Sequence, residues 1–273
     1  MQIIPPKNLS PYIKHYLFLE SARTPVNQFR LFPDGNTAMA FCFTNGSICV
    51  VNDNNELAKL PNTFMYGQLS TYQDLYLTDK TSFIIVVFQP YGINRLLGVT
   101  ANTIKNKIVS IEDAFGRQGL QLYERLIAQS DQRTRLQILN SFFFDIASKN
   151  PFADHPLLHS SLTYILQNNG AVKIEQLVRY TGYTERHIER TFSECVGLGP
   201  KQFGNIVKLH RFLKLLNDKS KQNNLTSLCY EGGYADQSHL IKEFRKYTGI
   251  TPSQYLDNSN RLAVNFFEFR PAQ

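Results

Sequence analysis

The chain has 273 residues, of which 42% are hydrophobic, and its 29 basic and 22 acidic side chains give a formal net charge of +7. This length predicts two domains, and the hydrophobic content is sufficient for packed cores and excludes wholesale disorder. The longest apolar runs, such as 83–88, are far shorter than the roughly 20 residues of a membrane helix, so no membrane partner is predicted. At the N-terminus, the stretch MQIIPPKNLS lacks the charged and apolar regions of a secretory leader, which predicts a cytoplasmic protein.

The first hundred or so residues read as β structure. Ala38–Phe43, Ser47–Val51 and Ser82–Gln89 are short apolar or β-branched runs, and turn-forming residues separate them. The dipeptide Asn45-Gly46 lies between the first two runs and is typical of the tight turn of a β-hairpin. We therefore predict a β-rich N-terminal domain with a hairpin at this dipeptide.

A helical segment follows from about Leu120 to Lys149, where apolar residues recur at helical spacing. Within it, the run Phe142-Phe143-Phe144 is apolar on too many sides of a helix to be left exposed. The run therefore predicts burial, either against the β structure or against a second subunit. Residues 151–156 contain two prolines and read as a linker, so residues 1–150 are assigned to the first domain.

The region 157–257 is almost entirely helical in pattern and contains an internal repeat. Each copy reads as a helix, a glycine-containing turn and a second helix, the pattern of the helix-turn-helix unit that binds the DNA major groove. A helical hairpin or an α-solenoid pair gives the same local pattern, so one copy alone leaves these alternatives open. Ile174–Phe203 recurs as Leu225–Tyr255 with an offset of 52, which matches Thr184 with Asp236, His187 with His239, Phe192 with Phe244 and Gly197 with Gly249.

The spacing of the two copies favours DNA binding. Pro200 can start a helix that continues to Leu216, about 17 residues or roughly 25 Å at 1.5 Å per residue. Adding the half-widths of the flanking units gives a separation near 34 Å. This is about one turn of DNA, so two second helices can enter successive major-groove segments on one face.

These residues resemble the AraC/XylS family of bacterial transcription regulators. The stretch GYADQSHLIKEFRKYTGITPSQY, which begins at Gly233, is similar to the family signature. TGYTERHIERTFSECVGLGPKQF, which begins at Thr181, resembles the more variable first half of the same domain. The resemblance extends over about residues 157–257, with Cys229 where the family usually has alanine.

The resemblance implies a transcription regulator, either an activator or a repressor, that binds double-stranded DNA and contacts RNA polymerase. It also implies an N-terminal half that senses a small-molecule effector and can form a homodimer. Pro33-Asp34-Gly35 followed by Ala38–Phe43, together with residues 83–99, resembles a less-studied N-terminal domain of some members. The predicted fold class is α+β with two domains. A β-rich, sensor-like domain with a helical segment (1–150) is followed by a linker (151–156), an all-α domain of two helix-turn-helix units joined by a long helix (157–257) and a C-terminal tail (258–273).

The outward-pointing residues of the two second helices are the candidate DNA-reading side chains. Arginine pairs with guanine, glutamine pairs with adenine, and lysine and serine contact bases or phosphates. A glutamate can accept a hydrogen bond from cytosine but also repels phosphate. The repeated histidines are assigned to helix packing or phosphate contact, because their spacing offers no converging metal ligands. The predicted DNA-binding residues are Arg186, Glu189, Arg190, Ser193, Gln237, Ser238, Lys242 and Arg245.

Other functions have weaker support in the sequence. Metal chemistry in the β domain would require converging histidines, and residues 1–150 contain only His15, so no metal or cofactor is predicted. A DNA-bound enzyme with a reactive Cys42 or Cys49 is a second hypothesis, and a helical protein-interaction module is a third. Aromatic residues of the β domain can line a ligand pocket or simply fill the core. We therefore predict no enzymatic activity, and the sequence identifies no ligand-binding residues.

Overall fold

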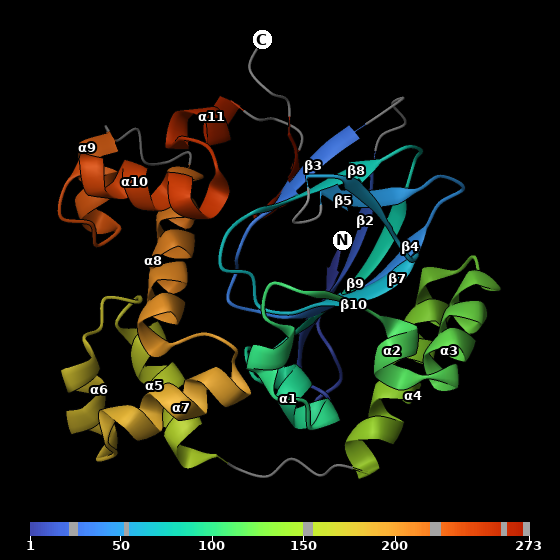
Figure 1. Ribbon diagram of the computed structural model, residues 1–273, viewed down its shortest axis with the longest axis horizontal. Coiled ribbons are helices and arrows are strands. Elements are labelled where there is room, and N and C mark those ends of the chain that lie inside the picture. The colour runs from blue at the N-terminus through green and yellow to red at the C-terminus, as the bar shows by residue number, and fades with distance from the viewer. Residues whose placement is uncertain (22–26, 52–54, 150–154, 219–224, 258–260, 270–273) are drawn as a thin grey trace.

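The computed structural model describes residues 1–21, 27–51, 55–149, 155–218, 225–257 and 261–269. These residues form a β-rich part with a group of helices on one side, and a purely helical part that packs beside it (Figure 1). The predicted fold class, a β-rich N-terminal domain followed by an all-α domain, is confirmed. The predicted linker falls largely on residues 151–154, which lie outside the described residues.

The β-rich part consists of two six-stranded antiparallel sheets. The first has the strand order β1-β2-β9-β4-β7-β10 and the second the order β11-β12-β3-β8-β5-β6. The strands are β1 (Gln2–Ile3), β2 (Ile13–Glu20), β3 (Asn27–Leu31), β4 (Ala38–Phe43), β5 (Ile48–Val51), β6 (Leu57–Leu60), β7 (Thr63–Tyr66), β8 (Gln73–Leu77), β9 (Ser82–Phe88), β10 (Ile108–Ser110), β11 (Arg261–Ala263) and β12 (Phe266–Glu268).

Strand β4 explains why its sequence is a continuous apolar run rather than an alternating one. Met39 and Phe41 pack into a core shared with the helices, whereas Ala40 and Cys42 pack into the core between the sheets. Successive side chains of a strand point to opposite faces, so a strand that is covered on both faces is apolar at every position. Strand β9, between β2 and β4, follows the same rule.

The predicted hairpin at Asn45-Gly46 is wrong. Strand β4 pairs with β7 and β9 in the first sheet, whereas β5 pairs with β6 and β8 in the second. The dipeptide therefore forms a corner between the two sheets. Ser47 continues this corner by donating its backbone N–H to the hydroxyl of Thr78 at 2.8 Å, next to β8. Pairing with distant strands that complete both sheets outweighs the local turn preference.

A group of short and long helices covers the outer face of the first sheet. The phenylalanine run lies on the last helix of this group: Phe143 is fully buried and its ring meets Phe88 of β9 at 5.7 Å, while Phe142 packs on Phe115 at 5.4 Å. Phe144 is 48% exposed. The predicted burial is thus achieved within the chain for two of the three rings. The helices are α1 (Gly92–Leu97), the 3-10 helix η1 (Ala101–Ile104), α2 (Ile111–Phe115), α3 (Arg117–Ile127) and α4 (Gln132–Lys149).

The helical part has the two helix-turn-helix units that the repeat predicts. The caps are in place, because the Thr184 hydroxyl accepts from the backbone N–H of His187, and the Asp236 carboxylate accepts from that of His239. Gly182 ends the first helix of its unit with a φ of 75°, a conformation that favours glycine. The helices are α5 (Pro156–Gln167), α6 (Ile174–Thr181), α7 (Glu185–Cys195), α8 (Pro200–Leu216), α9 (Leu225–Glu231), α10 (Gln237–Thr248) and α11 (Pro252–Asp257).

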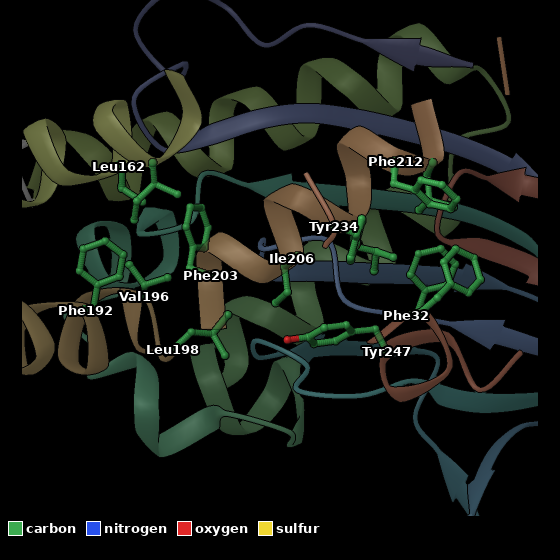
Figure 2. Close-up of a cluster of buried hydrophobic side chains, with 14 of the residues drawn as sticks. Phe32, Leu162, Phe192, Val196, Leu198, Phe203, Ile206, Phe212, Tyr234 and Tyr247 are labelled. Atoms are coloured by element: carbon green, nitrogen blue, oxygen red, sulfur yellow. The ribbon is translucent and has the colours of Figure 1, made fainter. Parts of the chain in front are cut away.

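The core of the helical part is continuous with the β-rich part. Phe192 of α7 and Phe244 of α10 are buried in the two helix-turn-helix units. Helix α8 connects them through buried residues such as Phe203 and Phe212 (Figure 2). Phe32, which follows β3, and Phe267 of β12 belong to the same cluster. The two parts of the chain therefore share a buried apolar interface.

Part of the segment predicted as a tail adds to the second sheet. Residues 261–268 form β11 and β12, and β12 pairs with β3 of the β-rich part. The chain thus returns to the N-terminal sheet after the second helix-turn-helix unit (Figure 1). Over the described ranges, the helices are too short or too polar for a membrane span.

Candidate nucleic-acid interface

Each helix-turn-helix unit exposes one face of its second helix. In α7, Ile188 and Phe192 are fully buried, and in α10, Leu240 and Phe244 take the same places. Burial of residues at i and i+4 leaves the opposite side of the helix for polar residues. The predicted DNA-reading residues therefore lie on two equivalent outward faces, one for each unit.

On α7, the outward face is basic at its centre. Arg186, Glu189 and Arg190 are exposed. Glu189 lies close to Gly199, and partial burial raises the pKa of its carboxyl, with Glu185 adding to the effect. Ser193 differs from the other three, because it is only half-exposed and its hydroxyl accepts a hydrogen bond from the Asn102 side chain of η1 at 3.2 Å. The β-rich part therefore already contacts one predicted DNA-reading residue.

On α10, three of the four predicted residues are exposed: Ser238, Lys242 and Arg245. Gln237 is half-exposed and donates its side-chain N–H to the hydroxyl of Thr226 on α9. This bond ties the start of α10 to the first helix of its own unit. Each helix thus carries one pair of exposed cationic side chains. The pairs are Arg186 with Arg190 on α7 and Lys242 with Arg245 on α10.

The repeated histidines lie at the start of the same helices. His187 stacks on Tyr183 with the ring centroids 5.3 Å apart, and His239 meets Tyr234 at 5.8 Å. Both contacts are packing contacts within the unit, one of the two roles expected for these residues. Among the described residues, no group of three or more metal-ligating side chains converges.

A buried ion pair that the sequence analysis did not identify fixes α10 to α8. Lys208 of α8 contacts Glu243 of α10 at 3.2 Å, and its ammonium lies 4.4 Å from the Tyr234 ring centroid. Both charged side chains are largely buried, so the loss of either would leave an uncompensated charge. The only sequence signal was a lysine on the buried side of α8.

A cavity of about 450 Å³ lies where the first sheet, α8 and the C-terminal strands meet. Its walls are mainly apolar, and a polar group formed by Lys14, His15, Asp34 and His210 lines part of them. His210 bonds the Pro33 carbonyl at 2.9 Å; burial lowers the pKa of its imidazole, and the Asp34 carboxylate opposes this effect. The apolar walls include Leu31, Ile85, Val207 and Phe266.

Three of the four cysteines do not have the environment of a nucleophile. Burial raises the pKa of the Cys42, Cys195 and Cys229 thiols, which disfavours the reactive thiolate. Cys49 is half-exposed on β5 of the second sheet. The hypothesis of a cysteine-dependent enzyme therefore has no support at these three positions.

Comparisons with known proteins agree with this geometry. Residues 177–258 match a family model described as a helix-turn-helix domain, and residues 1–110 match a domain of unknown function (DUF6597). An uncharacterized HTH-type transcriptional regulator of Haemophilus influenzae is 31% identical over 99 residues, 36% of this chain and 33% of that protein. The probable transcription factor PqrA of Proteus vulgaris is 24% identical over 103 residues, 37% of this chain and 82% of that protein.

The overall architecture also has a counterpart. The crystal structure of ToxT from Vibrio cholerae covers 91% of this chain and 98% of its own, at 12% identity and a TM-score of 0.50, which shows a shared fold. The chain is thus a two-domain protein with a double helix-turn-helix unit. Its C-terminal domain is of the AraC type and is joined to an N-terminal DUF6597 domain.

Proposed function

We propose that the chain is a sequence-specific, DNA-binding transcriptional regulator in which α7 and α10 enter successive segments of the major groove. The observation that carries this proposal is the pair of outward basic faces, Arg186 with Arg190 and Lys242 with Arg245, on two capped helices. The 17-residue helix α8 joins the two units and is about 25 Å long at 1.5 Å per residue. The net charge of +7 is consistent with a polyanionic partner.

The test is the salt dependence of DNA binding by the full chain. Fluorescence anisotropy with a duplex enriched from a random-sequence library gives the affinity at several salt concentrations. If six or more phosphates are neutralised, affinity should fall by about 10³-fold or more between about 50 and 200 mM salt. A chain that binds no duplex at about 50 mM salt would instead favour the helical protein-interaction module.

Replacing Lys242 with alanine should weaken binding to target and random duplexes alike. A lysine that contacts phosphate contributes about one unit to the slope of log K against log salt, so the variant's slope should be shallower by about that amount. Lys7→Ala is the matched control, because Lys7 is an exposed lysine of the β-rich part. A Lys242→Ala variant that loses only target binding would assign this lysine to a base instead.

The second part of the proposal is that a small-molecule effector binds the cavity between the two domains. Its volume of about 450 Å³ lies in the range of small-molecule sites, and its walls combine apolar surface with a few polar groups. Because residues of both domains line it, an occupant would contact the sensor-like part and α8 at once. This arrangement suits a molecule with an apolar body and one polar end.

A thermal-shift screen of small metabolites against the full chain tests this assignment. A compound at about 100 times its Kd should stabilise the fold by about 2.7 kcal/mol and raise the Tm by several degrees. Val207→Trp, which places a large side chain at the cavity wall, should abolish that shift. Compounds that stabilise both proteins equally would place the effector elsewhere.

The likeness to the AraC/XylS family extends the proposal to RNA polymerase, a homodimer and a cytoplasmic location, without enzymatic activity. The support for these points is the family resemblance alone. In vitro transcription with and without the chain tests the polymerase contact, and light scattering of the full chain measures its oligomeric state. Thiol labelling of the folded chain tests the enzymatic alternative, since a fast-reacting cysteine would favour it.

A further inference from the structure

The segment after the second helix-turn-helix unit binds the edge of the N-terminal sheet. We call residues 261–269 the C-terminal hairpin. Strand β12 of this hairpin pairs with β3, with Phe267 opposite Arg30. The pairing is extended at both ends, because the Phe32 N–H donates to the Asn265 carbonyl at 3.0 Å and the Phe269 N–H donates to the Gln28 carbonyl at 2.7 Å. Without the hairpin, β3 would pair only with β8 and would be the edge strand of the second sheet.

Two neighbouring phenylalanines of β12 pack into two different cores. Phe266 points between the sheets, where its ring lies 5.4 Å from that of Phe29. Phe267 points the other way and packs on Phe32 at 6.2 Å and on Tyr255 of α11 at 6.1 Å. The alternation of side chains along a strand therefore makes β12 a direct link between the sensor-like sheet and the helical domain.

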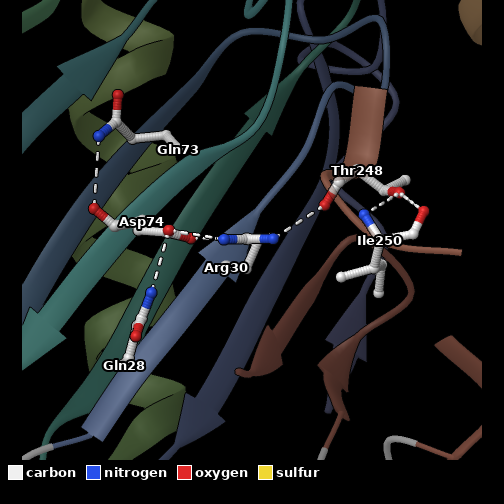
Figure 3. Close-up of polar contacts among 6 residues, drawn as sticks. All are labelled: Gln28, Arg30, Gln73, Asp74, Thr248 and Ile250. Atoms are coloured by element: carbon white, nitrogen blue, oxygen red, sulfur yellow. Dashed lines mark hydrogen bonds and ion pairs between the residues drawn. The ribbon is translucent and has the colours of Figure 1, made fainter. Parts of the chain in front are cut away.

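Arg30 of β3 lies beside β12 and contacts the end of α10 (Figure 3). We call α7 and α10, the second helices of the two units, the recognition helices. Its guanidinium forms a two-fold ion pair with Asp74, both N···O distances being 2.7 Å, and donates to the Thr248 carbonyl at 3.4 Å. The same group lies between the rings of Tyr72 and Phe269, at 4.0 and 3.8 Å from their centroids. The sheet, the C-terminal hairpin and α10 thus meet at one buried arginine.

The two recognition helices contact the N-terminal part at repeat-equivalent positions. Gly249, which ends α10, has a φ of 72°, and a Cβ there would lie 2.6 Å from both Arg30 and Tyr72. Its repeat partner Gly197, with a φ of 86°, faces the Ala101 carbonyl of η1, which would be 3.0 Å from a Cβ. Both glycines thus permit a close approach of the N-terminal part to the C-terminal end of a recognition helix.

This docking restricts the faces proposed for DNA. Ser193 lies on the same side of α7 as Arg186, two turns away, and Arg190, one turn away. The side chain of Asn102 of η1 donates a hydrogen bond to the Ser193 hydroxyl. The N-terminal part therefore covers one end of that face. Because DNA needs both recognition helices in successive groove segments, fixing both to one body also limits how their relative orientation can adjust.

We propose that the C-terminal hairpin is an autoinhibitory element: docked on β3, it holds α10 against the N-terminal domain and lowers DNA affinity. Its release frees the second helix-turn-helix unit. This inference rests on the proposed function, and it deepens it, since residues 263–266 of the hairpin also line the cavity. A molecule in the cavity would contact the element that sets DNA affinity.

The test uses Phe269→Pro in the full chain. Proline removes the N–H that bonds Gln28 and the ring that packs on Arg30, at the free end of the β12–β3 pairing. Leu57→Ala is the control, because Leu57 is 62% exposed on β6, at the opposite edge of the same sheet, and does not line the cavity. A chain ending at Asp257 serves as the second, more severe variant.

Two measurements are made on each protein. Hydrogen exchange of the backbone amides of residues 27–32 reports whether β3 has lost its pairing with β12. Fluorescence anisotropy with the duplex enriched by the wild-type chain reports the Kd for DNA. We expect faster exchange and about five- to tenfold tighter DNA binding for Phe269→Pro, a typical coupling between two sites. The Leu57→Ala control should match the wild type in both measurements.

The outcomes separate this inference from the proposed function. Faster exchange with unchanged or weaker DNA binding would overturn autoinhibition, and so would unchanged exchange in both hairpin variants. A wild-type chain and variants that all bind no duplex would refute DNA binding itself, while the exchange data would still report whether the hairpin docks on β3.

Discussion

Replacing Phe143 with alanine is expected to lower the free energy of unfolding by about 3–5 kcal/mol. Phe143 is fully buried on α4, with its ring against Phe88 of β9 and against Phe142. Removing the ring leaves a cavity between the first sheet and the helices that cover it, and the paired strands below limit how far this cavity can close. Urea unfolding followed by circular dichroism measures the change.

Phe144→Ala is the control for this prediction. Phe144 is the next residue along the helix but is 48% exposed, so its replacement should change the free energy of unfolding by less than about 0.5 kcal/mol. If Phe144→Ala were as destabilising as Phe143→Ala, and more so at higher protein concentration, the exposed ring would belong to an interface between subunits. The sequence left these two ways of burying the run open.

The helical domain could be predicted from the sequence because its determinants are local. Caps at Thr184 and Asp236, and apolar residues at i and i+4 such as Ile188 and Phe192, act over one or two turns. The repetition of these signals in the second unit also indicated the order of the elements. The outward faces of α7 and α10 followed from the same periodicity.

The sheets could not be predicted to the same depth, because strand pairing depends on distant residues. The chain does turn at Asn45-Gly46, as the dipeptide predicts. The strands on either side of it, β4 and β5, do not pair with each other, because they belong to different sheets. The C-terminal hairpin was missed because each of its strands has three residues, too few for a periodic pattern.

The candidate site was affected by the same limit. Spacing along α7 placed Ser193 with Arg186 and Arg190, but it could not show that Asn102, about ninety residues earlier, already bonds the serine hydroxyl. The buried pairs Arg30–Asp74 and Lys208–Glu243 join residues of distant segments, and nothing in the local pattern of either partner identifies the other. The outward face of a helix can be predicted from the sequence of that helix alone. Which residues cover that face can be known only from the whole fold.

Replacing Arg190 with alanine is expected to reduce the preference for the target duplex by about 1–3 kcal/mol, the value of one good arginine–guanine contact. Arg190 is exposed on the outward face of α7, and its guanidinium is 3.5 Å from the His187 ring nitrogen, so its loss leaves the buried side of the helix intact. Arginine also attracts phosphate, so affinity for random duplexes should fall as well, but by less.

The measurement is a set of anisotropy titrations of target and random duplexes with each variant, under one salt condition. Arg125→Ala is the matched control, because Arg125 is an exposed arginine on α3 of the N-terminal part, and it should leave both affinities unchanged. Equal losses on both duplexes would make Arg190 a phosphate contact. No loss on either, with an unchanged circular dichroism spectrum, would mean that α7 does not face DNA and that the second unit binds alone. That last result would also agree with η1 covering the end of the α7 face. Asn102→Ala, which removes the hydrogen bond to Ser193, is therefore the background in which Arg190→Ala should have its larger effect.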